Sequence, residues 1–208
     1  MINKFIKYVG KNFGNPNGII GKLFTKLMNI MNQKQYKAIL DNINLFPNNV
    51  ILDIGFGNGY LIKKLFKKNV EINIYGIEIS NDMIKIVTHK LKNYIKMNYL
   101  KLTLEGIEQT SFENNTFDKI CTVNTFYFWN ELEKCFSEIK RILKPNGIFL
   151  NAIYTKDYLD KIVYTKYGFK KYTVDEIKKI TEKNGMKVNE IIEIKKNKAY
   201  CIISENVK

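Results

Sequence analysis

Arginine is almost missing from this chain of 208 residues. Arg141 is the only arginine among 34 basic side chains, so the formal charge of +14 rests on lysine. Phosphate and base-edge recognition is usually built with the forked guanidinium group, and these lysines are spread along the whole chain. The chain is also crowded with isoleucine and asparagine, which with lysine have AT-rich codons. We interpret the charge as a solvated surface, with nucleic acid as a disfavoured partner.

Long apolar runs are missing too. No stretch approaches the ~18–20 apolar residues of a membrane span, and lysines interrupt the first residues, MINKFIKYVGKNF, unlike a signal peptide. Cys121, Cys135 and Cys201 lack metal-ligand spacing, which predicts buried, reduced thiols. We expect a cytoplasmic protein of one domain with no metal site, either a monomer or a homodimer.

The most informative stretch is Val50–Leu61, VILDIGFGNGYL. A short apolar run ends at three glycines spaced two apart, and an apolar and lysine pattern then resumes with helical period. This pattern predicts a buried strand, a tight turn and a helix. Gly55, Gly57 and Gly59 let backbone pass close to a ligand. Asp53 lies at the end of the strand, where its carboxylate can face the same crevice.

Two well-known nucleotide-binding patterns, the dinucleotide fingerprint and the P-loop, do not match this turn. A dinucleotide fingerprint needs a small residue at position 60, where this chain has Tyr60. The Gly-Lys-Ser/Thr ending of a P-loop is absent. A dehydrogenase is therefore disfavoured.

Strand and helix patterns alternate after the turn, which predicts a parallel, doubly wound α/β sheet. The second predicted strand ends in Glu78, 25 residues after Asp53, and an acid near that distance suits ribose hydroxyls. That strand is predicted at Ile72–Ile79, and further strands at Phe117–Asn124 and Ile148–Ile153, with helices after Ser80 and over Leu132–Leu143.

The series DIGFGNG, YGIEIS, SFENNTFDKI and EIKRILKPNGIF resembles the class I S-adenosylmethionine-dependent methyltransferases, of the methyltransferase type 11-like, small-molecule type. The motifs match in order and spacing over roughly residues 50–155. The resemblance implies a mostly parallel, seven-stranded Rossmann-like sheet with helices on both faces and an antiparallel last strand. It also implies S-adenosyl-L-methionine as the cofactor.

The resemblance assigns roles to the first two motifs. Asp53 and the backbone of the glycine turn are expected to hold the methionine end of the cofactor, and Glu78 its ribose. Ile79 and Met83 are expected to enclose the adenine, because a branched apolar side chain and a thioether give flat contacts. The turn residues expected to bind the cofactor are Gly55, Gly57, Asn58 and Gly59.

The third motif departs from the family. The Gly-Asp-Ala that usually meets the adenine edge corresponds here to Glu105-Gly106-Ile107, so Gly106 replaces the acid. Three alternatives stay open for the adenine amino group: Glu105, Glu108, or backbone near Ile107.

The fourth strand is expected to end beside the reactive methyl group, at Asn124 and Thr125. Asn124 and Tyr127 are the candidate catalytic residues, since His89, the sole histidine, is expected on the surface and no general base stands out. The aromatic run after Thr125 predicts an apolar wall for a substrate, with core packing as the alternative. Its expected substrate-binding members are Tyr127, Phe128 and Trp129.

Both ends add to the cofactor-binding core at 50–155. Residues 1–49 are expected to form a helical lid or cap, with a hinge at 15–18, or else a static packing helix. Residues 156–208 predict a capped helix at Thr173–Asn184 and an edge hairpin of Lys187–Ile194 and Lys198–Ser204.

The expected function is methyl transfer from S-adenosylmethionine to a small molecule by in-line displacement. The alternatives are a methyltransferase acting on RNA or another macromolecule, and a cofactor-binding protein without turnover. The methyl acceptor and its atom are not written in the sequence.

Overall fold

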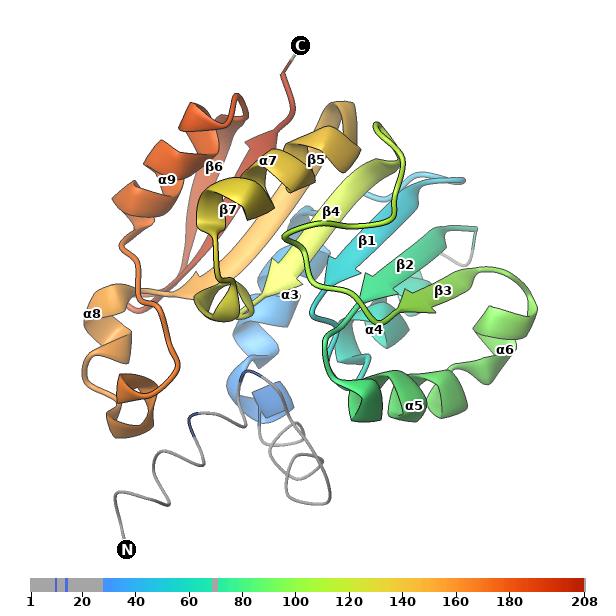
Figure 1. The fold of residues 1–208 in the computed structure, drawn as a ribbon, viewed down its shortest axis with the longest axis horizontal. Coiled ribbons are helices and arrows are strands. Elements are labelled where there is room, and N and C mark those ends of the chain that lie inside the picture. The colour runs from blue at the N-terminus through green and yellow to red at the C-terminus, as the bar shows by residue number, and fades with distance from the viewer. Residues whose placement is uncertain (1–9, 11–13, 15–27, 69–70, 208) are drawn as a thin grey trace, which may run out of the picture.

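The computed structural model describes residues 10, 14, 28–68 and 71–207. A seven-stranded sheet forms its centre, with the strands in the order β3-β2-β1-β4-β5-β7-β6 (Figure 1). The first five strands of that order are parallel, and β7 runs antiparallel to both β5 and β6. The predicted fold class is therefore confirmed. The strands are β1 Val50–Ile54, β2 Asn73–Ile77, β3 Leu100–Thr103, β4 Phe117–Val123, β5 Leu143–Tyr154, β6 Lys187–Lys195 and β7 Ala199–Glu205.

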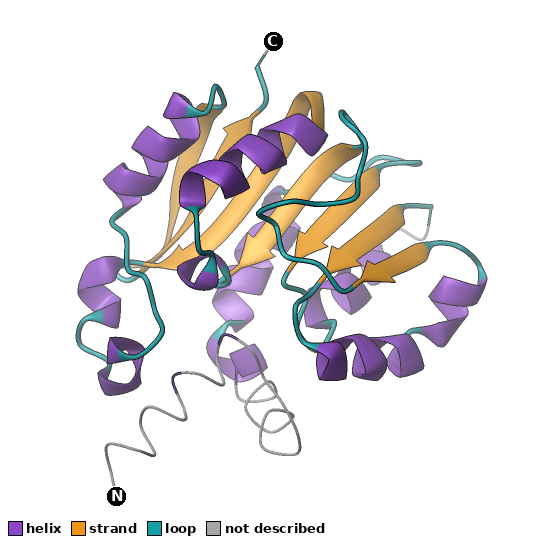
Figure 2. Cartoon of the chain, viewed as in Figure 1, coloured by secondary structure: helices purple, strands orange, loops and turns teal. Residues whose placement is uncertain are grey.

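Helices cover both faces of the sheet (Figure 2). One core cluster joins the sheet to apolar side chains of α3 (Gln33–Asn42), α4 (Tyr60–Lys68) and α5 (Asn81–Lys90). A second cluster, on the opposite face, joins it to α7 (Leu132–Ile142) and α9 (Val174–Lys183). Because side chains of a strand alternate between faces, each buried strand contributes to both clusters. Shorter elements are α6 Lys92–Lys96, η1 Phe126–Phe128, α8 Lys156–Leu159 and η2 Val163–Lys166.

Helix ends follow local capping chemistry. The Ser80 hydroxyl accepts a hydrogen bond from the Met83 amide at the start of α5. Thr173 and Glu176 form the predicted capping box of α9, and Gly185 follows that helix with φ of 73°. These contacts mark where α5 begins and where α9 begins and ends.

One predicted boundary was wrong. The strand predicted at Ile148–Ile153 is longer in the structure, since β5 begins at Leu143, directly after α7. Leu143 pairs with Phe117 and Ile148 pairs with Lys119, so the residues 144–147 loop out between two β4–β5 pairings. The turn-forming sequence Lys-Pro-Asn-Gly therefore interrupts the strand instead of preceding it.

The amino-terminal predictions are only partly covered. The hinge at 15–18 and the start of the predicted helix lie outside the described residues. Residues 28–31 are helical, Asn32 makes a turn, and α3 follows at once. In the part of the chain that the structure describes, no helix is long and apolar enough to cross a membrane.

Candidate cofactor site

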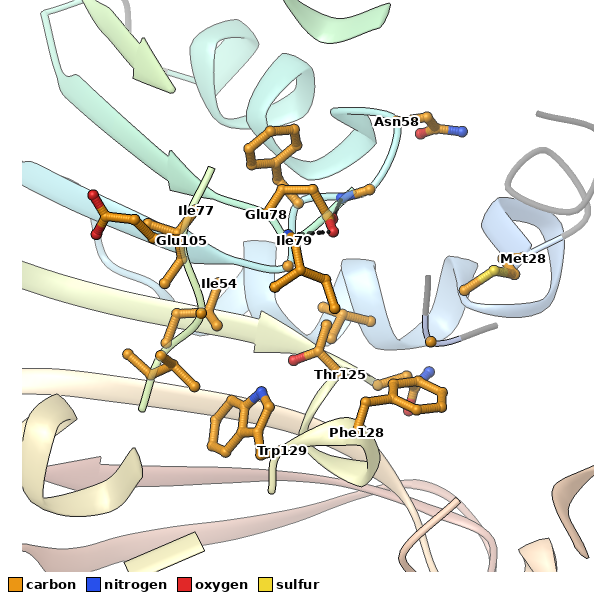
Figure 3. A pocket seen from close by; sticks show the side chains of 18 of the residues that line it. Met28, Ile54, Asn58, Ile77, Glu78, Ile79, Glu105, Thr125, Phe128 and Trp129 are labelled. Carbon is orange, nitrogen blue, oxygen red and sulfur yellow. Dashed lines mark hydrogen bonds between the residues drawn. The ribbon is translucent and has the colours of Figure 1, made fainter. Parts of the chain in front are cut away.

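A pocket lies at the carboxyl ends of β1, β2 and β4, where the strand order reverses direction. Its empty space is about 960 Å³ when the part open to solvent is counted. Figure 3 shows Glu78 and Ile79 on one side and Phe128 and Trp129 on the other. The predicted site residues that line it are Gly55, Gly57, Asn58, Glu78, Ile79, Gly106, Ile107, Asn124, Thr125, Phe128 and Trp129.

Glu78 is the best-fixed polar group of the pocket. One carboxylate oxygen accepts a hydrogen bond from the Gly57 amide at 2.9 Å, and the other accepts from the amides of Ile79 at 2.8 Å and Ser80 at 3.1 Å. Burial raises the pKa of the carboxyl, and these amide bonds act in the opposite direction. The oxygen bound to Gly57 accepts only that one bond and keeps lone-pair capacity for a further donor. Glu78 thus presents an oriented acceptor to the pocket.

The glycines of the turn serve different purposes. All three have positive φ, and a Cβ on Gly55 would come within 2.5 Å of the Thr125 methyl group. A Cβ on Gly59 would touch Val87 at 3.0 Å. At Gly57 a Cβ would meet nothing within 4 Å, because the position opens into the pocket. Gly57 therefore keeps backbone accessible to a ligand.

Asp53, which is predicted to hold the methionine end of the cofactor, lies behind the surface of the pocket. It is buried, its side chain does not line the pocket, and its Oδ2 atom has no hydrogen-bond partner among the described residues. Strand alternation turns it toward the α3 side, where Tyr36 does line the pocket. Burial, and secondarily the charge of Glu78, raises the pKa of Asp53 well above its usual range. The phenol pKa of Tyr36 is also raised, by burial first and by Asp53 second.

The adenine-side predictions divide. Ile79 is 51% exposed and lines the pocket. Met83, a residue of α5, is fully buried in the core and does not line the pocket. The sequence assigned Met83 to the wrong side because helical period alone does not tell which face meets the sheet. Glu105 and Glu108 line the pocket, but their carboxylates bind Ser111 and the Asn130 amide, respectively.

Asn124 has left-handed backbone, with φ of 56°, which asparagine tolerates better than most residues. Its amide donates to the Asn32 side chain at 3.0 Å and its oxygen accepts from the Tyr127 phenol, also at 3.0 Å. Tyr127 donates as well to the Tyr154 carbonyl and accepts from the Tyr154 amide. Burial raises the phenol pKa well above its usual value. Tyr127 thus holds Asn124 in place, and the raised pKa of its phenol disfavours a role as a base.

The aromatic run after β4 does not form one wall. Trp129 lines the first pocket, and Tyr127 lines a second, adjoining pocket instead. Phe128 lines both, and Phe126 is buried in the core. The packing interpretation therefore holds for Phe126, while its neighbours face two different spaces.

The sequence predicted that the amino-terminal segment covers the site, near Gly57 and Asn124, but it did not identify the contacts by which residues 28–36 do so. Asn29 donates to the Asn58 side chain at 3.1 Å, and the Asn32–Asn124 bond joins positions 92 residues apart. Met28 and Tyr36 line the first pocket with them. A Cβ on Gly14 would lie 2.7 Å from the Phe128 ring. The cluster of asparagines before α3 was the available signal, but nothing local pairs it with β4.

His89 is exposed and all three cysteines are buried and free, as predicted. No metal-binding cluster of histidine, cysteine and acidic residues occurs within the described ranges.

Comparisons with known proteins agree with this geometry. A family model described as a methyltransferase domain matches residues 52–151. The uncharacterized methyltransferase YdaC of Bacillus subtilis is 27% identical over 121 residues, which are 58% of this chain and 65% of that protein. The mitochondrial arginine-hydroxylase NDUFAF5 of Mus musculus is 30% identical over 115 residues, 55% of this chain and 31% of that protein.

A solved structure of a SAM-dependent methyltransferase from Aquifex aeolicus has a TM-score of 0.74 at 22% identity. The match covers 89% of this chain and 98% of that one. The fold is therefore the Rossmann-like methyltransferase fold. Over residues 52–151, where the methyltransferase-domain family model matches, the chain is similar to the class I S-adenosylmethionine-dependent methyltransferases, as its motifs indicated. It spans less than two-thirds of the length of the two curated relatives.

Proposed function

We propose that this protein binds S-adenosylmethionine in the first pocket and transfers its methyl group to a small molecule. The observation that carries the proposal is the buried Glu78 carboxylate, which three backbone amides aim at the pocket beside the open Gly57 turn. A carboxylate oxygen with a spare acceptor site suits a ribose hydroxyl. The family match supports the same ligand.

The remaining residues fit such a ligand. Ile79 and Ile107 offer apolar contacts to a flat base, and the engaged carboxylates of Glu105 and Glu108 leave backbone near Ile107 to meet its edge. Asp53 is followed in the sequence by Ile54, which lines the pocket, and its Oδ2 atom has no hydrogen-bond partner among the described residues. A carboxylate in this position suits the positively charged end of a ligand. When bound, the cofactor supplies a methyl group activated on a sulfonium sulfur.

We infer that these residues promote methyl transfer by aligning the acceptor with the methyl group of the cofactor. No histidine or lysine lines either pocket in the described part of the chain. The side chain of Asn124 is fixed by hydrogen bonds to Asn32 and Tyr127. We infer that it positions the methyl acceptor relative to the bound cofactor. Positioning of this kind supplies up to about 7–11 kcal/mol of a barrier in favourable cases.

S-adenosylhomocysteine is expected to bind with a micromolar Kd and to raise the melting temperature by mass action. Titration calorimetry and thermal melts of the full chain measure both. No heat and no thermal shift at millimolar ligand would reject the proposed cofactor. Adenosine alone serves as the control for the ribose contacts.

A second candidate is cofactor binding that serves a reaction other than methyl transfer. It is favoured by the relative named an arginine-hydroxylase and by the missing general base. Binding of S-adenosylhomocysteine, with no methylated product from any acceptor, would support it. A macromolecular acceptor would instead show binding to RNA that falls steeply with salt, with a log–log slope near −0.7 per phosphate contact.

We also propose that the segment before α3 acts as a lid. Its described part already covers the site, through the Asn29–Asn58 and Asn32–Asn124 hydrogen bonds. Hydrogen exchange at residues 28–36 is expected to slow when S-adenosylhomocysteine is added, more than at α9. Equal exchange with and without the ligand would make the segment a static packing element.

A further inference from the structure

The second pocket adjoins the first at Asn32, Asn124 and Phe128, which line both. It is the smaller of the two pockets, and its empty space of about 450 Å³ includes a part that is open to solvent. The segment after β5, with α8 and η2, lies at the carboxyl ends of β4 and β5 and supplies much of its wall (Figure 1). The two pockets therefore meet at Asn124, the residue that ends β4.

Six of the thirteen residues that line this pocket are aromatic. Phe169 packs against Phe128 with 4.7 Å between ring centroids, and against Tyr127 at 5.8 Å. Tyr154 and Tyr158 pack at 5.0 Å. Four aliphatic and three uncharged polar side chains complete the wall, and no charged residue lines it in the described chain. The lining residues are Met28, Met31, Asn32, Asn124, Tyr127, Phe128, Tyr154, Tyr158, Leu159, Ile162, Tyr164, Thr165 and Phe169.

Most polar groups of the wall are already bound within the protein. The Tyr154 phenol donates to the Met31 carbonyl at 3.0 Å, and the Tyr127 phenol binds Asn124. The Thr165 hydroxyl is directed at the carbonyls of Leu159 and Ile162. A charged ligand would lose its hydration here without gaining a partner, which is costly. An apolar ring would gain contact area instead.

Aromatic walls also attract alkylammonium cations, but two observations weigh against that ligand here. The ammonium of Lys198 already lies 5.6 Å from the centre of the Tyr158 ring. No carboxylate lines the pocket to balance a second cation, and the chain carries a net charge of +14.

We propose that the second pocket is the acceptor chamber and that it takes a small, uncharged aromatic molecule. This inference rests on the proposed function, because the molecule bound in the second pocket would be the acceptor of the methyl group. The ring faces of Tyr158 and Phe169 would hold the acceptor flat. The amide of Asn124 would meet the acceptor's polar end where the two pockets join.

The test uses the full chain with saturating S-adenosylhomocysteine and three probes: 2-naphthol, choline and benzoate. Calorimetry should show binding of 2-naphthol and none, or at least about tenfold weaker binding, of the two charged probes. Ile162→Trp, which adds bulk inside the pocket, should weaken 2-naphthol by at least about tenfold. Val163→Trp is the matched control, because Val163 is 56% exposed and does not line the pocket.

Preferential binding of choline or benzoate would overturn the proposal, and so would 2-naphthol binding that Ile162→Trp leaves unchanged. Intermolecular NOEs from 2-naphthol to the Tyr158 and Phe169 rings provide the same test without a substitution, and their absence would reject the chamber. S-adenosylhomocysteine should bind all three proteins alike. Its failure to bind, with 2-naphthol still bound in this pocket, would reject the proposed cofactor and leave the aromatic pocket standing.

Discussion

Glu78→Ala is expected to weaken S-adenosylhomocysteine binding by about 1.5–3 kcal/mol, the scale of charge-assisted hydrogen bonds, or roughly 10- to 150-fold in Kd. The substitution removes the proposed ribose acceptor. It also frees the amides of Gly57, Ile79 and Ser80, which the carboxylate now holds. Titration calorimetry on both proteins measures the change.

Glu105→Ala is the matched control for this experiment. Glu105 is also an acid that lines the first pocket, but its carboxylate binds Ser111 instead of the turn. Its removal should change the Kd by less than about threefold. An effect equal to that of Glu78→Ala would mean that the pocket responds to overall charge, and unchanged affinity in Glu78→Ala would mean that the ribose is held elsewhere.

The sequence predicted what local chemistry decides. The glycine turn, the Ser80 cap and the Thr173–Glu176 capping box all lie where their residue types required. Strand runs broken by turn residues gave the parallel sheet, because alternation of strands and helices leaves few ways to bury both faces. The interruption of β5 was missed, since a Lys-Pro-Asn-Gly turn reads the same before a strand as within one.

Long-range contacts within the site could not be predicted. The pairing of Asn32 with Asn124 depends on how α3 crosses the sheet, and no short pattern records it. The direction of Asp53 depends on strand register, where a shift of one residue exchanges the two faces. Met83 fits the helical period whether it faces the ligand or the core. The spacing of motifs in the sequence thus located the site. The packing of helices against the sheet determines which of the predicted residues reach the pocket.

Asp53→Asn is expected to stabilise the ligand-free protein at neutral pH, by on the order of 2–4 °C in Tm for each kcal/mol gained. The carboxyl is buried, and its Oδ2 atom finds no partner among the described residues. Its pKa is raised well above the usual range by burial, with the charge of Glu78 adding to the shift. Ionisation therefore costs folding energy that a neutral amide of the same shape avoids.

The pH dependence of the stability gain follows from the same shift. Between the unfolded pKa of Asp53 and its higher folded pKa, the native state binds more protons, so the free energy of unfolding falls as pH rises. The advantage of Asp53→Asn should accordingly be largest above the folded pKa and should shrink as pH falls toward the unfolded value. Chemical denaturation at several pH values measures it. Asp41→Asn, at an exposed pair with Lys37, should change stability by less than about 1 kcal/mol at every pH.

The same substitution is expected to weaken S-adenosylhomocysteine binding several-fold, because it removes the negative charge that we propose balances the ligand's ammonium. A gain in stability together with a loss of affinity would show that the Asp53 carboxylate lowers the stability of the fold and strengthens ligand binding. A loss of stability at neutral pH would show that the carboxylate is compensated inside the fold. Unchanged affinity would show that its charge does not reach the pocket.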